Sequence, residues 1–145
     1  MTGAYQIVLR LRRPQTIWVG PRLGARRFPA GWYVYTGSAM GSGGIEPRVR
    51  RHLDRAKTTR HWHIDYLTTH PHVSVEAVLR YPARRGQECA INRSTAHLPG
   101  AAVPVPGFGN SDRGKSGACT CAAHLVRFTR RFRTSSRAPA RTASL

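Results

Sequence analysis

Acidic residues are scarce in this chain of 145 residues, where 6 Asp and Glu stand against 24 Lys and Arg, for a formal net charge of +18. Lysine is scarce too, because 22 of the 24 cations are arginines. The codon bias of a GC-rich genome explains arginine in place of lysine, but it does not explain the shortage of acids. Such a surface suits a polyanionic partner, since neutralised phosphates release their counterions. Charge alone does not distinguish DNA from RNA.

Long apolar runs are also missing. Arg10, Arg12 and Arg13 interrupt the first apolar stretch, so the chain does not begin like a signal peptide. No stretch approaches the roughly 18 apolar residues of a membrane span. Cysteine is scarce, with three residues, and the odd number together with the Cys119-x-Cys121 spacing argues against a disulfide framework and for a reducing compartment. We therefore expect a cytoplasmic protein with no membrane partner.

Length and composition predict one small domain. A chain of 145 residues with 40% apolar content can build a modest single core. We place this domain over residues 1–133. Residues 134–145 consist mainly of Ser, Thr, Ala, Arg and Pro, a composition typical of a disordered basic tail.

Strands are predicted where apolar and polar side chains alternate, over residues 5–11 and 32–36. A further strand is expected at 73–81, and a short extended piece at 17–19. Loops rich in Gly and Pro separate the first of these segments, which favours antiparallel pairing. Helices are expected at 45–56, 61–67, 86–97 and 121–132. The mixture of strands and helices indicates the α+β class.

The helix expected at 45–56 has one narrow apolar face when its residues are placed at 100° intervals. This face consists of Ile45, Val49, Leu53 and Ala56. Arg48 and His52 fall at its border, where a long side chain can run along a sheet while its polar end reaches a cleft. Glu46, Arg50 and Asp54 can pair with one another on the exposed side.

Two tyrosines and an arginine carry the strongest chemical signal. Tyr5 follows Gly3-Ala4, Tyr35 opens the segment Tyr35–Ala39, and Arg48 lies on the helix that follows. A phenol can move a proton to or from water, and a guanidinium can stabilise a phosphoryl oxygen. Both are needed wherever a phosphodiester is attacked, so the lead hypothesis is a nuclease. The alternatives are two strand aromatics that pack a sheet and one more surface arginine.

The same segments resemble the GIY-YIG endonuclease superfamily. The resemblance rests on GAYQI at 3–7, VYTGSA at 34–39 and Arg48-x-x-x-His52. Four further segments are similar to its small branch known as domain of unknown function 123, namely FPAGWYVY at 28–35, HWHIDY at 61–66, ECA at 88–90 and GFGNSD at 107–112. Members of that branch occur alone or fused to the DNA-repair enzyme endonuclease III. The resemblance covers residues 3–128 and implies a three-stranded antiparallel sheet flanked by helices.

The resemblance also implies roles for five residues. Tyr5 or Tyr35 would activate a water molecule, Arg48 would stabilise the phosphate, and His52 would assist. Glu88 would hold one Mg²⁺ or Mn²⁺, a hard cation suited to one carboxylate plus waters and phosphate oxygens. A structural salt bridge to an arginine is the alternative for Glu88. Because a tyrosine with a pKa of about 10 is a poor base at neutral pH, the cation or Arg48 has to favour the phenolate.

Two other groups of residues offer metal ligands. His61 and Asp65 share a helix face, although such a pair is more often a hydrogen-bonded structural contact. Cys119, Cys121 and His124 could hold a structural Zn²⁺, but their Cys-x-Cys spacing differs from the Cys-x-x-Cys of common zinc sites. We therefore favour buried, inert thiols.

One departure from the branch lies in this cysteine region. The branch usually places a cysteine directly after the Ser111-Asp112 pair, whereas here residues 113–118 intervene. This is either a tolerated loop insertion or damage to the local structure.

These observations favour a metal-dependent endonuclease that hydrolyses DNA phosphodiester bonds, in repair or recombination. Arg50, Arg51 and Arg55 are the residues expected to contact the nucleic acid. The alternative is a catalytically weak nucleic-acid-binding module that assists a DNA-repair protein. RNA as the substrate stays open, because charge does not select the polymer.

Overall fold

The central feature of the fold is an antiparallel sheet with β1 in its middle. The computed structural model describes residues 1–82, 87–109, 123–131 and 142–144. Within these residues the elements are β1 (Gly3–Leu11), β2 (Gln15–Trp18), β3 (Ala25–Phe28), β4 (Gly31–Ala39), α1 (Ile45–Leu53), α2 (His63–Thr68), β5 (Val73–Pro82), α3 (Gln87–Ala96), β6 (Leu125–Phe128) and β7 (Thr142–Ser144). The strand order is β6-β4-β1-β5-β7, and every adjacent pair is antiparallel. A separate hairpin pairs β2 with β3.

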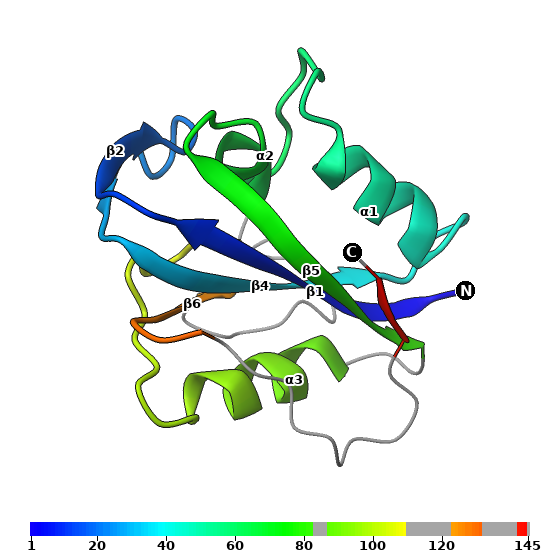
Figure 1. Cartoon of the computed structure of the whole chain (residues 1–145). Helices are drawn as coiled ribbons and strands as arrows, with labels where there is room; N and C mark the ends of the chain where they lie inside the picture. The colour runs from blue at the N-terminus through cyan, green and yellow to red at the C-terminus, as the bar shows by residue number, and fades with distance from the viewer. Residues whose placement is uncertain (83–86, 110–122, 132–141, 145) are drawn as a thin grey trace.

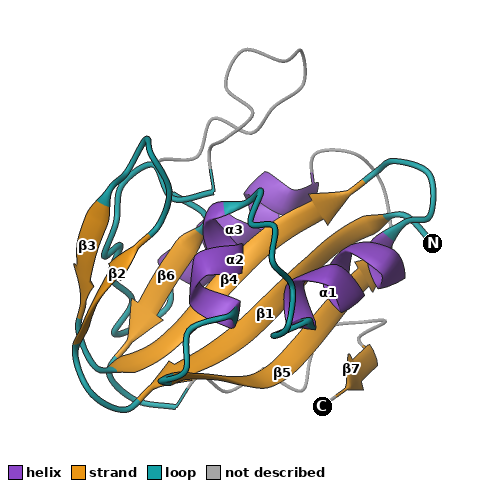
Figure 2. Cartoon of the chain, turned by 90° about the horizontal axis from the view of Figure 1, so that it is seen from above, coloured by secondary structure: helices purple, strands orange, loops and turns teal. Residues whose placement is uncertain are grey.

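Helices cover both faces of the sheet, with α1 and α2 on one face and α3 on the other (Figure 1). Seen from above, α1 and α2 lie in front of the sheet (Figure 2). The alternation in β1 explains this arrangement, because residues i and i+2 of a strand point to the same face. Tyr5, Ile7, Leu9 and Leu11 belong to the core under α1 and α2, while Val8 belongs to a second apolar cluster.

The face covered by α3 is held by a buried polar network around Gln6. The side-chain amide of Gln6 donates to Thr36 Oγ1 at 3.1 Å and to Thr95 Oγ1 at 2.8 Å. The hydroxyl of Tyr81 donates to Gln6 Oε1 at 2.8 Å. One buried glutamine thus ties β1 to β4, β5 and α3 through satisfied hydrogen bonds, which is the condition for burying a polar group at little cost.

The sequence correctly predicted the α+β class and the strands that became β1, β4 and β5. The helix expected at 121–132 is wrong, because residues 125–128 form β6 instead. Their partner is the edge of β4, where Trp32 pairs with Phe128 and Tyr35 with Leu125. Burial of Leu125, Val126 and Phe128 on both faces of that edge outweighs any helical tendency. The sheet among the described residues is therefore wider than the three strands expected.

Three smaller expectations also changed. Helix α1 ends at Leu53, so Ala56 is exposed rather than part of the apolar face. Glu46 pairs with Arg80 on β5 at 2.5 Å, a contact with the neighbouring strand rather than along the helix. Cys89 is disulfide-bonded, whereas the odd number of cysteines argued against a disulfide framework.

Two further observations bear on the predicted boundaries and compartment. Residues 142–144, within the segment 134–145 that was expected to be a disordered tail, form β7 against β5, and residues 134–141 and 145 of that segment lie outside the described residues. In the described part of the chain, none of the helices combines the length and apolar content that spanning a membrane requires.

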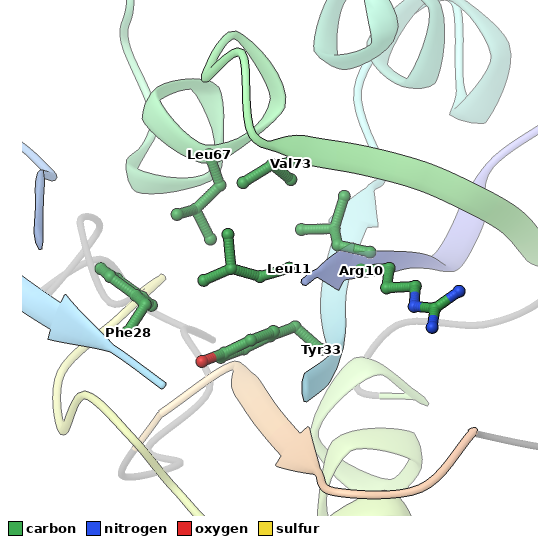
Figure 3. A pocket seen from close by; sticks show the side chains of 7 residues that line it. Arg10, Leu11, Phe28, Tyr33, Leu67 and Val73 are labelled. Atoms are coloured by element: carbon green, nitrogen blue, oxygen red, sulfur yellow. The ribbon is translucent and has the colours of Figure 1, made fainter. Parts of the chain in front are cut away.

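A small apolar cavity lies between the sheet and α2 (Figure 3). Its lining residues are Leu9, Arg10, Leu11, Phe28, Tyr33, Leu67 and Val73, and the side chain of Arg10 points away from the others. The cavity measures about 10 Å³ and has no polar surface. A water molecule needs roughly 10–15 Å³ and two or more polar partners. This cavity is therefore a packing gap and not a ligand site.

Candidate active site

Three of the predicted residues meet at one end of the sheet, under α1. Tyr5 from β1, Tyr35 from β4 and His52 from α1 form a cluster of rings. The centroid distances are 6.3 Å between the tyrosines, 5.7 Å from Tyr5 to His52 and 6.1 Å from Tyr35 to His52. Exposure is only 1% for Tyr5 and His52 and 8% for Tyr35. The sequence placed His52 at the border of the apolar face of α1, whereas the structure buries it together with Ile45 and Val49.

Gly37 makes room for the ring of Tyr5. The two residues lie opposite each other in the β1–β4 register. A Cβ atom at position 37 would come within 2.5 Å of the Tyr5 hydroxyl oxygen and ring. The glycine is therefore required by close approach, and it lets Tyr5 lie across β4 toward α1.

The hydroxyl of Tyr5 is hydrogen-bonded to His52. Its oxygen lies 2.8 Å from Nε2 of the imidazole. The other ring nitrogen, Nδ1, lies 3.1 Å from Oδ1 of Asp65 on α2. Tyr5, His52 and Asp65 thus form a continuous hydrogen-bonded chain that begins in the sheet and ends in a second helix.

Asp65 is the residue whose place in the site the sequence did not indicate. It is completely buried, and both carboxylate oxygens accept hydrogen bonds. Oδ1 accepts from His52 and from Lys57 Nζ at 2.7 Å, while Oδ2 accepts from the backbone N–H groups of His61 and Trp62. The expected hydrogen-bonded reading of the His61–Asp65 pair is confirmed, with the contact made by the backbone of His61.

Arg48 lies beside this cluster, half-buried at the border of α1 as its helical phase predicted. Its Nη1 donates to the carbonyl oxygen of Ser38 at 2.6 Å, and its guanidinium carbon lies 5.3 Å from the ring centroid of Trp62. A hydrogen bond on one side and a cation–π contact on the other hold the guanidinium in one place.

Glu88 approaches from the first turn of α3, on the opposite layer. Its Oε1 lies 3.1 Å from Nδ1 of His124, and its side chain is 23% exposed. His124 is anchored next to β4, because its N–H donates to Phe108 and its carbonyl accepts from Thr36. The group nearest to Glu88 is thus a histidine nitrogen and not the arginine that the structural alternative expected.

The charges of Arg48 and Glu88 both act on the two phenols. Burial is the main reason that the pKa of Tyr5 and of Tyr35 lies well above the ordinary value. The Glu88 carboxylate raises the pKa of each phenol further, and the Arg48 guanidinium lowers it. Arg48 and Glu88 are therefore close enough to Tyr5 and Tyr35 to change their pKa values, although the residues come from α1, the sheet and α3.

Electrostatics fixes the charge states of the other two members of the cluster. Burial lowers the pKa of His52 despite the opposing effect of Asp65, so the imidazole is neutral at pH 7. Burial alone would raise the pKa of Asp65, but hydrogen bonds from His52, Lys57 and the Trp62 backbone hold it well below its usual range. An ionised carboxylate can only accept, so Nδ1 of His52 carries the proton and Nε2 accepts from Tyr5.

The residues expected to bind nucleic acid lie on and just after α1. Arg50 is exposed and lines a shallow surface groove next to Arg80. Arg51 donates to the carbonyl of Thr59 at 3.4 Å. Arg55 donates to the carbonyls of Val73 and His70, both at 2.8 Å. These hydrogen bonds stabilise the start of β5.

The other predicted metal ligands are only partly described. Cys119 and Cys121, like Asp112, lie outside the described residues, and His124 lies beside Glu88. Across residues 1–82, 87–109, 123–131 and 142–144, no three His, Cys, Asp or Glu side chains gather as a metal cluster.

The fold and the site together define a small α+β domain with a buried Tyr–His–Asp chain at one end of its sheet. The chain belongs to the family described as domain of unknown function DUF123, whose family model matches residues 4–144. This confirms the branch to which the sequence motifs are similar. No curated protein and no solved structure matches the chain.

Proposed function

We propose that this protein is an endonuclease that hydrolyses phosphodiester bonds, with DNA as its substrate. The observation that carries the proposal is the 2.8 Å contact of Tyr5 with a neutral His52, next to the opposite charges of Arg48 and Glu88. A phenol held by a proton acceptor and an arginine fixed beside it are the groups that attack on a phosphodiester needs.

Each residue has a specific task in this proposal. Tyr5 takes a proton from the attacking water, and His52 assists it. Tyr35 packs against both rings and keeps the site dry. Arg48 stabilises the charge that develops on the phosphoryl oxygens, and its contacts with Ser38 and Trp62 preorganise it for this task.

A divalent cation fits beside Glu88. Mg²⁺ and Mn²⁺ bind through one or two carboxylates and complete their shell with waters and phosphate oxygens. Glu88 is a single, partly exposed carboxylate whose negative charge raises the pKa of both phenols, so a cation there is electrostatically favoured. When bound, the cation would polarise the scissile phosphate.

Similarity to the GIY-YIG superfamily supports the same proposal. The adjacent antiparallel strands β4, β1 and β5 with helices on both faces support it, and so does the position of Tyr5, Tyr35 and Arg48 on the α1 side of the sheet. Work in DNA repair or recombination beside a repair partner, in the cytoplasm, is part of the proposal. The disulfide of Cys89 argues instead for an oxidising compartment, since structural disulfides are rare in the cytosol.

Cleavage of plasmid and branched DNA with Mg²⁺ or Mn²⁺ tests this function. We expect Arg48→Ala and Glu88→Ala to lower the rate by about 10²-fold or more while the fold is kept. Matched controls are Arg93→Ala, an exposed arginine on α3, and Glu76→Ala on β5, which should cleave like the wild type. Equal activity in all four variants would show that the cleavage has another origin.

A catalytically weak binding module is the second candidate. The net charge of +18 favours it, and so does the 1% exposure of Tyr5, which leaves a substrate water little access. Salt-sensitive DNA binding without cleavage would select this candidate. Cleavage of single-stranded or structured RNA but not of DNA would show that RNA is the substrate, with the same proposed chemistry.

A further inference from the structure

The buried carboxylate of Asp65 is not among the residues to which the sequence motifs assign a role. We propose that Asp65 is a positioning residue that holds His52 in the tautomer able to accept the proton of Tyr5, so that Tyr5 and His52 work as a proton relay. This inference rests on the proposed endonuclease function and specifies how its base operates.

The hydrogen-bond directions carry the inference. Asp65 accepts hydrogen bonds from three N–H donors, the Lys57 ammonium and the backbone of His61 and Trp62, and an ionised carboxylate has no proton to give. The Nδ1 atom of His52 must therefore be the donor across the 3.1 Å contact. This leaves the lone pair of Nε2 facing the Tyr5 hydroxyl at 2.8 Å.

Hydrogen bonds from the start of α2 and from Lys57, which follows α1, fix the position of Asp65. Its Oδ2 accepts the backbone N–H groups of His61 and Trp62 at the start of α2. Lys57, bonded to Oδ1, also donates to the carbonyls of Arg51 and His52 at the end of α1. The ammonium group thus fastens the carboxylate to the same helical turn that carries the imidazole.

A relay explains how a phenol with a raised pKa can serve as a base. As the water O–H bond breaks, its proton moves to the Tyr5 oxygen, and the Tyr5 proton moves to Nε2 of His52. The hydroxide oxygen bonds to phosphorus, and the bond from phosphorus to the leaving oxygen breaks. The proton on His52 later returns through Tyr5 to solvent or to the leaving oxygen. No free phenolate forms at any stage.

The charges around His52 decide the pH dependence of the relay. Asp65 on α2 stabilises the imidazolium, while Lys57 from the α1–α2 connection and Arg48 from α1 oppose it. The sheet contributes the two phenols of Tyr5 and Tyr35, which are neutral at pH 7. Removing the charge of Asp65 therefore lowers the pKa of His52.

The first test uses the protein alone, labelled with ¹⁵N in its histidines. Long-range ¹H–¹⁵N spectra should show His52 as the Nδ1–H tautomer in the wild type, with that form losing at least half of its population in Asp65→Asn. Thr68→Val is the control, because it removes a hydrogen bond to Lys57 without touching His52. A wild-type His52 protonated only on Nε2 would overturn the inference, whether or not the protein cleaves DNA.

The second test follows cleavage against pH. Asp65→Asn should lower the rate by roughly 10²- to 10⁴-fold, as expected when a base is left in the wrong tautomer, and should move the acid limb to lower pH. A purely structural role would lower the melting temperature and leave the acid limb in place, which would refute the relay. If Asp65→Asn does not fold, the double variant Asp65→Asn, Lys57→Met removes the unpaired ammonium and allows the same measurements.

The two tests also separate this inference from the proposed function. If the wild type cleaves no nucleic acid, the proposed function fails while the tautomer measurement still decides the role of Asp65. If it cleaves and the acid limb of Asp65→Asn matches the wild type, the function stands and the relay is wrong.

Discussion

Gly37 and Tyr5 face each other across β1 and β4, and the hydroxyl of Tyr5 occupies the space that a side chain at position 37 would fill. The position of the phenol therefore depends on the absence of a single methyl group on the next strand. This relationship leads to the first prediction.

Gly37→Ala should displace Tyr5 and weaken its hydrogen bond to His52. A buried ring that cannot move away makes the added methyl costly, and overpacking of this kind destabilises by about 1–3 kcal/mol. Denaturant unfolding measures the loss of stability. The cleavage rate should fall further than the smaller folded fraction alone explains. Gly41→Ala is the control, since nothing lies within 4 Å of an added Cβ there. Equal effects at both glycines would contradict this explanation.

Gln6→Leu should destabilise the fold without changing the candidate site. The substitution removes the partner of the buried Thr36 hydroxyl and one partner of the Tyr81 hydroxyl, on the face covered by α3. Leaving buried polar groups unsatisfied costs about 1–3 kcal/mol. Thermal unfolding should show this loss, while the His52 tautomer stays that of the wild type. A changed tautomer would mean that the two faces of the sheet are coupled.

Stability should decrease as the pH falls below the ordinary pKa of histidine, about 6.5. The pKa of His52 is lowered in the folded state. As the pH falls, the unfolded chain therefore binds a proton at this histidine first, and this stabilises the unfolded state. One such group contributes at most about 1.4 kcal/mol per pH unit. His63 acts with the same sign, because burial and Arg22 lower its pKa.

The pKa of Asp65 is lowered as well, so its contribution is present above about pH 4 and is lost as the pH falls through its folded value. Unfolding free energies of the wild type and His52→Gln between pH 4 and 8 measure the histidine part. The variant should show a shallower slope between pH 6.5 and 5. An unchanged slope would mean that the pKa of His52 is not lowered in the folded protein.

Arg50→Ala should affect DNA binding, whereas Arg55→Ala should affect the stability of the fold. Arg50 is exposed, so its loss should weaken DNA binding and reduce the salt slope by roughly 0.9, the value for one phosphate contact. Arg55 bonds to the carbonyls of His70 and Val73, so its loss should lower the melting temperature. Binding titrations at several salt concentrations together with thermal unfolding distinguish the two. An unchanged salt slope for Arg50→Ala would remove it from the interface.

The sequence predicted those parts of the molecule that depend on local pattern. Alternation located β1 and β4, and helical phase placed Arg48 at the border of the apolar face of α1, although it placed His52 there too and His52 is buried. The strand β6 was missed because LVRF is too short to show a period, and the edge of β4 decides its structure. Helical spacing predicted a contact of Asp65 with His61. The contact of Asp65 with His52 joins α2 to α1, and the periodicity of one helix does not predict a contact with another.

Glu88 is held by α3 on one side of the sheet, while Arg48 and His52 are held by α1 on the other. The charges that act on Tyr5 and Tyr35 therefore come together only after both layers have docked. A partly folded chain would keep its positive charge but would lack this arrangement of charges around the two phenols. In the proposed endonuclease, hydrolysis would therefore begin only after both layers have docked, so that immature molecules would leave nucleic acid uncut.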